Sequence, residues 1–155
     1  MKKFKKNISA FMFFLLDTAV LSAILFVLKE LAIKQYMSSS PLNNPVFKID
    51  YVMNTGAAFG LLNQQSAFLC GIAAFVLCSI IYYIFKKGKK INYFERFTYA
   101  LIFAGILSNT FERLKTGAVL DYINLNFVNF PVFNSADIFI CIGAILLVFI
   151  LIFKR

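Results

Sequence analysis

Four apolar runs constrain the fold of this 155-residue chain more than any other feature. They cover residues 8–28, 67–85, 97–111 and 132–153. We interpret each run as a transmembrane helix, because crossing a bilayer takes roughly 20 apolar residues. The composition, 61% hydrophobic and 15% charged, differs from that of soluble domains. The sequence therefore predicts an all-α membrane protein in which residues 1–155 form a single integral membrane domain with four transmembrane helices.

The basic residues predict the direction in which the helices cross. The chain has sixteen Lys and Arg residues against seven Asp and Glu residues, a net charge of +9. Eleven of the sixteen lie beside ends of the apolar runs: Lys2, Lys3, Lys5, Lys6, Lys86, Lys87, Lys89, Lys90, Arg96, Lys154 and Arg155. Cytoplasmic loops of membrane proteins are enriched in Lys and Arg. We therefore predict a multi-pass protein with both termini in the cytoplasm and residues 29–66 and 115–132 outside. The same placement argues against nucleic acid as a partner.

Two features of the first half of the chain refine this topology. A cleaved signal peptide is the alternative for residues 8–28, because a basic segment precedes them. The run is long for a signal peptide and no small-x-small cleavage site follows, so we favour a retained helix. Residues 46–52 are rich in β-prone side chains with partial alternation, which predicts one or two strands at the outer membrane surface.

Two acids, Asp121 and Asp137, border apolar runs on the predicted outer side. Either one alone is best explained as a helix cap. Together at one membrane face, the two carboxylates could share a proton, because neighbouring carboxylates cannot both ionise cheaply. The ionised member could then activate water while the protonated member donates its proton. The chain has no His and its three Cys lack metal-ligand spacing, so we expect neither a metal nor another cofactor.

Polar residues at the end of the third run allow two interpretations. Glu112 could be neutralised by Lys115, with Arg113 reaching lipid head groups. Alternatively, Glu112 and Arg113 could tie the outer loops to Asn109 and so position the two acids. Adjacent residues of a helix do not face each other, so Glu112 and Arg113 need not pair together.

Other polar positions are likewise ambiguous. Asn54 and Asn134 suit turns, but they could also hydrogen-bond a substrate backbone. Gly56 lies in a segment of small residues that allows close backbone approach. Asp17, about midway through the first run, is either functional or paired with another polar group of the helix bundle.

Four motifs, taken together and in this order, resemble those of the signal peptidase II family, the lipoprotein signal peptidases. The resemblance covers roughly residues 41–143. The motifs are Asn54-Thr55-Gly56-Ala57-Ala58-Phe59, Asn109-Thr110-Phe111-Glu112-Arg113, Gly117-Ala118-Val119-Leu120-Asp121-Tyr122 and Phe133-Asn134-Ser135-Ala136-Asp137.

This resemblance implies an intramembrane aspartic endopeptidase of the bacterial inner membrane, with its active site at the extracytoplasmic face. The family has four helices, a small β-sheet cradle and a surface loop. It removes signal peptides from prolipoproteins, cutting before a cysteine that carries diacylglycerol, and is blocked by globomycin. The resemblance assigns catalysis to Asp121 and Asp137. It assigns substrate-binding or supporting roles to Asn54, Gly56, Asn109, Glu112, Arg113, Asn134 and Ala136. We expect a monomer in contact with prolipoprotein and membrane lipid.

The sequence departs from the family pattern at three points. Ser108 stands where the family usually has Gly, and Glu112 replaces an Asp. The family's first helix carries Asp-x-x-x-Lys; here Lys29 matches the Lys but Leu25 occupies the Asp position.

These departures leave open an alternative function, a non-catalytic paralogue that binds lipoprotein or lipid in the membrane. Glu30 with Lys34 keeps the four-residue spacing but lies nearer the outer surface, and the roles of both residues stay open. A channel or transporter also fits four crossings, but it would need polar positions along the whole crossing. Here they gather at one face, which makes that function the least favoured.

Overall fold

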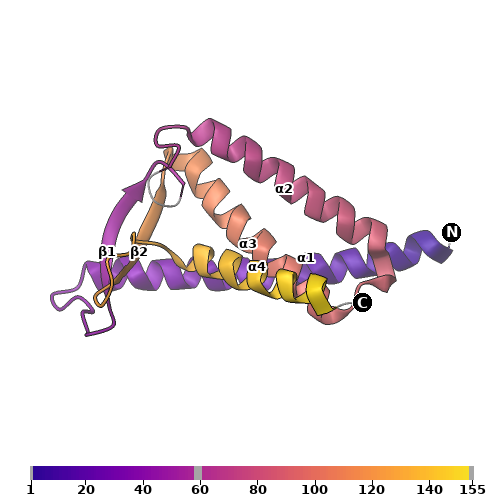
Figure 1. Ribbon diagram of the computed structural model, residues 1–155, viewed down its shortest axis with the longest axis horizontal. Coiled ribbons are helices and arrows are strands. Elements are labelled where there is room, and N and C mark those ends of the chain that lie inside the picture. The colour runs from indigo at the N-terminus through magenta and orange to yellow at the C-terminus, as the bar shows by residue number, and fades with distance from the viewer. Residues whose placement is uncertain (1, 58–60, 154–155) are drawn as a thin grey trace.

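The computed structural model describes residues 2–57 and 61–153. Within these residues the chain forms four α-helices, one short 3₁₀ turn and two strands (Figure 1). In chain order the elements are α1 (Lys2–Tyr36), β1 (Phe47–Asn54), α2 (Ser66–Lys87), η2 (Gly88–Lys90), α3 (Tyr93–Thr116), β2 (Val119–Leu125) and α4 (Ser135–Phe153). The predicted fold class, four helices with a small sheet, is confirmed.

Three of the helices are long and apolar enough to cross a membrane: α1 over Asn7–Tyr36, α2 and α4, with mean hydropathies of 2.4, 2.4 and 3.0. The fourth helix, α3, carries charged residues near both ends and packs against each of the other three. It extends beyond the apolar run at residues 97–111. Its first turn is capped by the Asn92 side chain, which accepts a hydrogen bond from the Glu95 N–H, and its last residue is followed by Gly117 at φ 80°.

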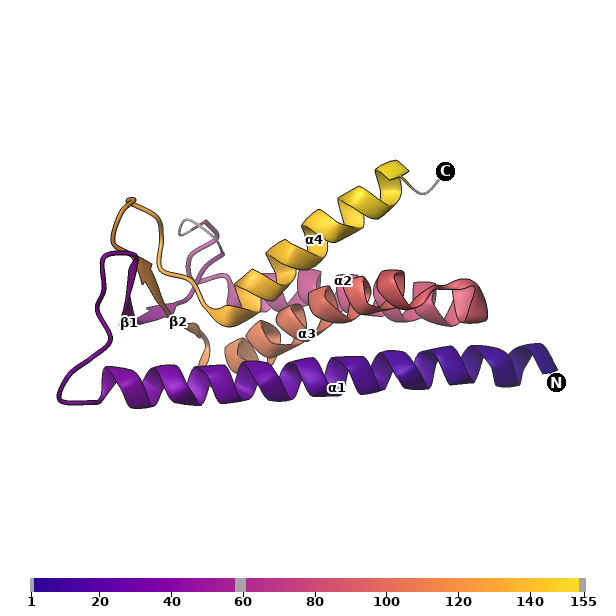
Figure 2. The same ribbon diagram turned by 90° about the horizontal axis from the view of Figure 1, so that it is seen from below.

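The two ends of the molecule differ in character. The sheet lies at one end, together with the end of α3 and the start of α4 (Figures 1 and 2). We call this the sheet end. At the opposite end α1 begins, α4 ends, and η2 joins α2 to α3 after Lys86 and Lys87. We call this the basic end.

Two glycines allow α3 and α4 to pack closely. A Cβ atom on Gly105 of α3 would lie 2.6 Å from the Ala136 carbonyl oxygen. A Cβ atom on Gly143 of α4 would lie 2.5 Å from Cγ1 of Ile102. Small residues let helix backbones approach each other in this way in membranes. The α3–α4 contact therefore fixes where the first turn of α4 lies along α3. This turn carries Asp137.

We expect Gly105→Ala to destabilise the protein by about 1–3 kcal/mol, because an added methyl group in a filled contact forces the backbone to shift. Thermal unfolding in detergent measures this effect as a lower Tm. The matched control is Gly71→Ala on α2, where a Cβ atom would meet no other atom within 4 Å. An unchanged Tm for Gly105→Ala would contradict the close α3–α4 contact.

The sequence left open whether Asp17 is functional or paired within the helix bundle. In the structure Asp17 pairs with Arg96. The Arg96 Nε lies 2.8 Å from Oδ2 of Asp17, and both side chains are largely buried between α1 and α3. The Arg96 guanidinium also lies over the ring of Phe13, 5.2 Å from its centre. An ionised group inside a membrane protein needs such a partner. Asp17 therefore belongs to a helix-pairing contact away from the sheet end.

The sheet is a single antiparallel pair in which Val52 lies opposite Asp121. The predicted strand at residues 46–52 corresponds to β1, whereas β2 was not predicted. Leu120 and Tyr122 of β2 form a buried cluster with Ala32 near the end of α1. Successive side chains of a strand point to opposite faces, so Asp121 faces away from that cluster. This alternation turns the carboxylate of Asp121 toward the helices α3 and α4.

Candidate active site

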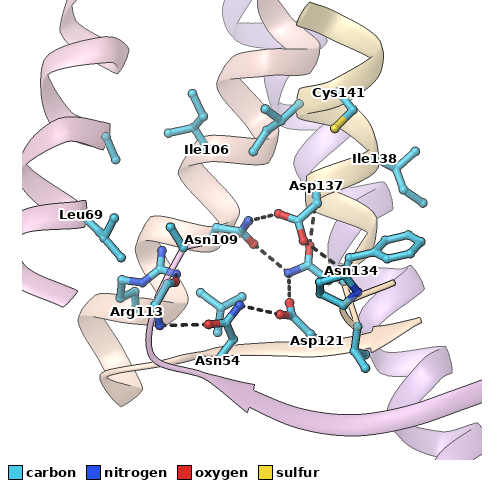
Figure 3. Close-up of a pocket in the computed structure, with 18 of the residues that line it drawn as sticks. Asn54, Leu69, Ile106, Asn109, Arg113, Asp121, Asn134, Asp137, Ile138 and Cys141 are labelled. Carbon is cyan, nitrogen blue, oxygen red and sulfur yellow. Dashed lines mark hydrogen bonds between the residues drawn. The ribbon is translucent and has the colours of Figure 1, made fainter. Parts of the chain in front are cut away.

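Two carboxylates from different elements line one cavity at the sheet end (Figure 3). Asp121 comes from β2 and Asp137 from the first turn of α4. The cavity has a volume of about 910 Å³. Its other polar lining includes four side chains that the sequence also singled out, Asn54, Asn109, Arg113 and Asn134, together with Thr55 and Asn63. The fold thus brings together residues from four separate motifs.

Asn134 caps α4 and Asp137 completes the cap. The Asn134 Oδ1 accepts hydrogen bonds from the Ala136 N–H at 2.8 Å and the Asp137 N–H at 3.1 Å. In return, Oδ2 of Asp137 accepts from the Asn134 N–H at 3.0 Å. This reciprocal arrangement is a capping box, which stabilises the helix start and fixes both side chains. The interpretation of Asp137 as a capping residue is therefore right, and the same geometry presents its carboxylate to the cavity.

Asp121, by contrast, caps no helix. It is 3% exposed, and both of its carboxylate oxygens accept hydrogen bonds from side-chain amides. The Asn134 Nδ2 donates to Oδ1 at 2.8 Å, and the Asn54 Nδ2 donates to Oδ2 at 2.9 Å (Figure 3). Asn134 therefore donates a hydrogen bond to both carboxylates. Its side-chain NH₂ group donates to Asp121, and its backbone N–H donates to Asp137.

Backbone N–H groups determine which way these amides point. The Asn54 Oδ1 accepts from the Gly56 N–H at 2.9 Å, and the Asn134 Oδ1 accepts from the start of α4. Each amide must therefore turn its NH₂ group toward Asp121. The Asn134 NH₂ also donates to Oδ1 of Asn109, whose own NH₂ group donates to Oδ1 of Asp137 at 2.8 Å. Every oxygen of the two carboxylates thus accepts one N–H, which supports negative charge in a buried site.

The pKa of Asp121 is raised to about 6, mainly by burial of its carboxylate. The negative charge of Asp137 contributes to this rise, whereas the hydrogen bonds from Asn54 and Asn134 and the nearby charge of Arg113 oppose it. The carboxylate of Asp121 can therefore change its protonation state near neutral pH, as a general acid or base must.

Arg113 holds the segment that follows β1. Its Nη2 donates to the Gly56 carbonyl oxygen at 2.8 Å, and its Nε is buried without a partner among the residues described. Gly56 is itself closely packed, because a Cβ atom there would lie 2.7 Å from the Leu61 carbonyl oxygen. The close backbone approach expected at Gly56 is therefore present.

Glu112 does not pair with Lys115, so that interpretation was wrong. Its Oε1 lies 2.6 Å from the Nζ of Lys29 and accepts a hydrogen bond from the Leu120 N–H at 3.1 Å. Lys115 is exposed one turn further along α3. Glu112 ties α1 and β2 to α3, which agrees with the alternative interpretation that it positions the outer segments.

Three supporting contacts were not predicted from the sequence. The Tyr122 and Ser135 hydroxyls lie 2.6 Å apart, and the Ser135 N–H donates to the Tyr122 hydroxyl at 3.2 Å. The N–H of Ile123 donates to the Phe133 carbonyl, which joins β2 to the residues before α4. Strict alternation of apolar and polar residues does not mark β2, but its β-branched and aromatic residues could have suggested a strand. Ala136 lies buried beside these contacts, under Gly105.

Beyond the acids the cavity is apolar. Its walls come from α2, α3 and α4 through Leu69, Ile72, Ala73, Val76, Ile106, Cys141, Ile142 and Ile145. Cys141 lies one helical turn beyond Asp137, so the apolar lining begins directly next to the carboxylates (Figure 3). A ligand here would combine a polar group at the sheet with an apolar part between the helices.

Comparison with known proteins shows the family of this chain. Residues 9–153 match the family described as Signal peptidase (SPase) II. This chain belongs to the signal peptidase II family. It is similar to the lipoprotein signal peptidase of Caldanaerobacter subterraneus subsp. tengcongensis, with 40% identity over 81% of this chain and 86% of that protein. The lipoprotein signal peptidase of Yersinia enterocolitica is 38% identical over 82% of each chain.

Solved structures support the same assignment. A bacterial membrane enzyme determined by the in meso method at 2.3 Å resolution matches with a TM-score of 0.78 and 30% identity, covering 90% of this chain and 87% of that chain. A second, determined at 1.9 Å resolution, matches with a TM-score of 0.73 and 27% identity over 92% and 94%. The signal peptidase II chain described here is therefore a membrane-embedded protein with the fold of these enzymes.

The family motifs and the geometry converge on the same residues. The positions at which the resemblance predicted catalytic aspartates, Asp121 and Asp137, are the two carboxylates joined through Asn134. Leu25, which the sequence comparison with the family pattern sets at the position of the first-helix Asp, is 2% exposed and packs in the helical core.

Proposed function

We propose that this protein is an aspartic endopeptidase that removes the signal peptide from diacylglyceryl-modified prolipoproteins, cutting before the lipid-bearing cysteine. The observation that carries this proposal is the pair of carboxylates bridged by Asn134 at the head of an apolar cavity, in a member of the signal peptidase II family. An aspartic mechanism needs two such groups and no metal or cofactor.

The proposed reaction starts with one aspartate ionised and the other protonated. The ionised carboxylate takes a proton from a water molecule, whose oxygen attacks the scissile carbonyl carbon. The protonated carboxyl group gives its proton to the carbonyl oxygen, which forms a tetrahedral diol. Collapse of the diol breaks the C–N bond, and the leaving amine receives a proton from the pair. Asp121 and Asp137 act as a unit, with a proton shared between them.

The neighbouring residues support this reaction by holding the two carboxylates and orienting the substrate. Asn54, Asn109 and Asn134 fix the carboxylates. The buried Nε–H of Arg113 is available to a carbonyl oxygen of the substrate backbone, since an unmade hydrogen bond in a buried site is costly. The apolar walls of α2 and α4 suit the hydrophobic signal segment and the acyl chains of the substrate. The substrate therefore stays in contact with membrane lipid.

We infer that the sheet end faces the extracytoplasmic side and that both termini are cytoplasmic. The supporting observation is the concentration of Lys beside η2 at the basic end, which follows the positive-inside rule. Cysteine labelling tests this orientation in a variant whose native cysteines are replaced by Ala. A membrane-impermeant maleimide should label Ser39→Cys, but not Lys90→Cys, in intact cells. The opposite pattern would reverse the orientation.

The function is tested with purified protein in detergent. A diacylglyceryl-modified prolipoprotein should be cleaved at the bond before its modified cysteine, globomycin should block cleavage, and the same precursor without the lipid should be a poorer substrate. Mass spectrometry of the products identifies the bond. If the folded protein binds the precursor but never cleaves it, the non-catalytic paralogue becomes the better account.

A further inference from the structure

Lys29 stands outside the cavity but is linked to the strand that carries Asp121. Its Nζ lies 2.6 Å from the Glu112 Oε1, with side chains 29% and 14% exposed. The same Oε1 accepts the Leu120 N–H at 3.1 Å. Leu120 immediately precedes Asp121 in β2. One carboxylate oxygen therefore joins the end of α1, the last turns of α3 and the backbone beside Asp121.

The Leu120 contact matters because this part of β2 is buried. A buried backbone N–H must find an acceptor. A carboxylate makes a shorter and stronger bond to an N–H than a neutral carbonyl does. A carboxylate in such a half-buried place is costly unless a cation lies beside it. Lys29 supplies that cation.

α1 offers no acid to Lys29 at the position where the family pattern has one. Leu25, one turn earlier, is 2% exposed and packs in the core. Glu112 stands where the sequence comparison places a shorter Asp, and its longer side chain reaches both Lys29 and Leu120. Glu112 is thus one member of this ion pair, and Leu25 lies one helical turn before the other member, Lys29.

We propose that Lys29 is a positioning residue for Asp121, acting through Glu112 and the Leu120 N–H. This inference rests on the proposed function, because it concerns the placement of a catalytic carboxylate. Asp137 is fixed on α4 by the capping box, so movement of β2 changes the spacing of the two acids. Asn54 and Asn134 hold the Asp121 side chain, while Glu112 holds the backbone next to it.

The test compares Lys29→Met with Lys34→Met, an exposed lysine further along α1. We expect Lys29→Met to lower kcat by about tenfold while KM changes less than about twofold, because misplacing a catalytic group by a fraction of an ångström has effects of this order. Lys34→Met should leave both constants unchanged. Lys29→Arg, which retains the charge, should restore most of kcat.

A double-mutant cycle shows whether Lys29 acts through Glu112. Glu112→Gln should reproduce the loss of kcat, and Lys29→Met combined with Glu112→Gln should be no worse than Glu112→Gln alone, because residues in one network are not additive. Independent losses that multiply, or a Lys29→Met variant with the kcat of wild type, would overturn the proposal.

Hydrogen exchange separates this proposal from the proposed function. The Leu120 amide should exchange faster in Lys29→Met than in wild type, while it stays protected in Lys34→Met. This readout needs no cleavage. If wild type cleaves nothing, the proposed function fails, but the exchange result still decides whether Lys29 holds β2. Unchanged protection of Leu120 in Lys29→Met would refute the positioning role even in an active enzyme.

Discussion

Cleavage of the lipid-modified precursor is expected to fall by at least roughly a thousandfold in both Asp121→Asn and Asp137→Asn, because groups that act as one catalytic unit each cost most of the activity when removed. The amide is nearly the same size as the carboxylate, so each variant keeps the cavity while losing the charge and the exchangeable proton. The measurement is kcat in detergent, with product masses confirming the cleaved bond.

A carboxylate of the same sheet provides the control. Asp50 lies in β1 outside the cavity, half-exposed, with a hydrogen bond from Asn124 at 3.1 Å. Asp50→Asn should retain the activity of wild type, and thermal unfolding in detergent should show that all three variants are folded at the assay temperature. Near-normal processing by either Asp121→Asn or Asp137→Asn in a folded protein would remove that aspartate from the mechanism.

The second large effect is expected for Asn54→Ala. Of the two aspartates, only Asp121 loses a hydrogen bond in this variant, and the Gly56 N–H loses its acceptor. We expect a loss of up to about a hundredfold in kcat/KM, since the Asp121 side chain is then held from one side only. The Asn54 hydrogen bond lowers the pKa of Asp121, so its removal raises that pKa above its value of about 6. When kcat/KM is plotted against pH, either the acid or the alkaline limb of the curve should therefore move to higher pH.

The limb that moves identifies the state in which Asp121 works. If Asp121 must be ionised, activity is lost as pH falls through its pKa, so the acid limb moves upward. If Asp121 must be protonated, activity is lost as pH rises through its pKa, so the alkaline limb moves upward. Asn109→Ala is the matched variant, because Asn109 donates to Asp137 instead. A profile unchanged in Asn54→Ala would show that this hydrogen bond does not act on the titrating group.

Much of the architecture follows from the sequence because its signals are local. Four apolar runs separated by basic and polar segments predict the helices, since each run needs no partner to be recognised as a potential crossing. The number of crossings likewise predicts that Asp121 and Asp137 lie on the same side of the membrane. The helix ends were less predictable, because caps such as Asn92 and Gly117 extend α3 beyond its apolar part.

The details of the site depend on contacts between distant segments. The strand β2 exists because β1 and the end of α1 provide its two partners, and nothing within residues 119–125 specifies those neighbours. The partner of Glu112 could not be chosen from sequence spacing, since Lys115 is near along the chain but Lys29 is near in space.

The sequence by itself determined the class of protein, the number of helices and the candidate catalytic residues. The tertiary structure alone decided how those residues face each other. The amide orientations of Asn54 and Asn134 depend on backbone N–H groups at Gly56 and at the start of α4. Hydrogen bonds act over only about 3 Å, so their partners are settled when the helices and the sheet pack together.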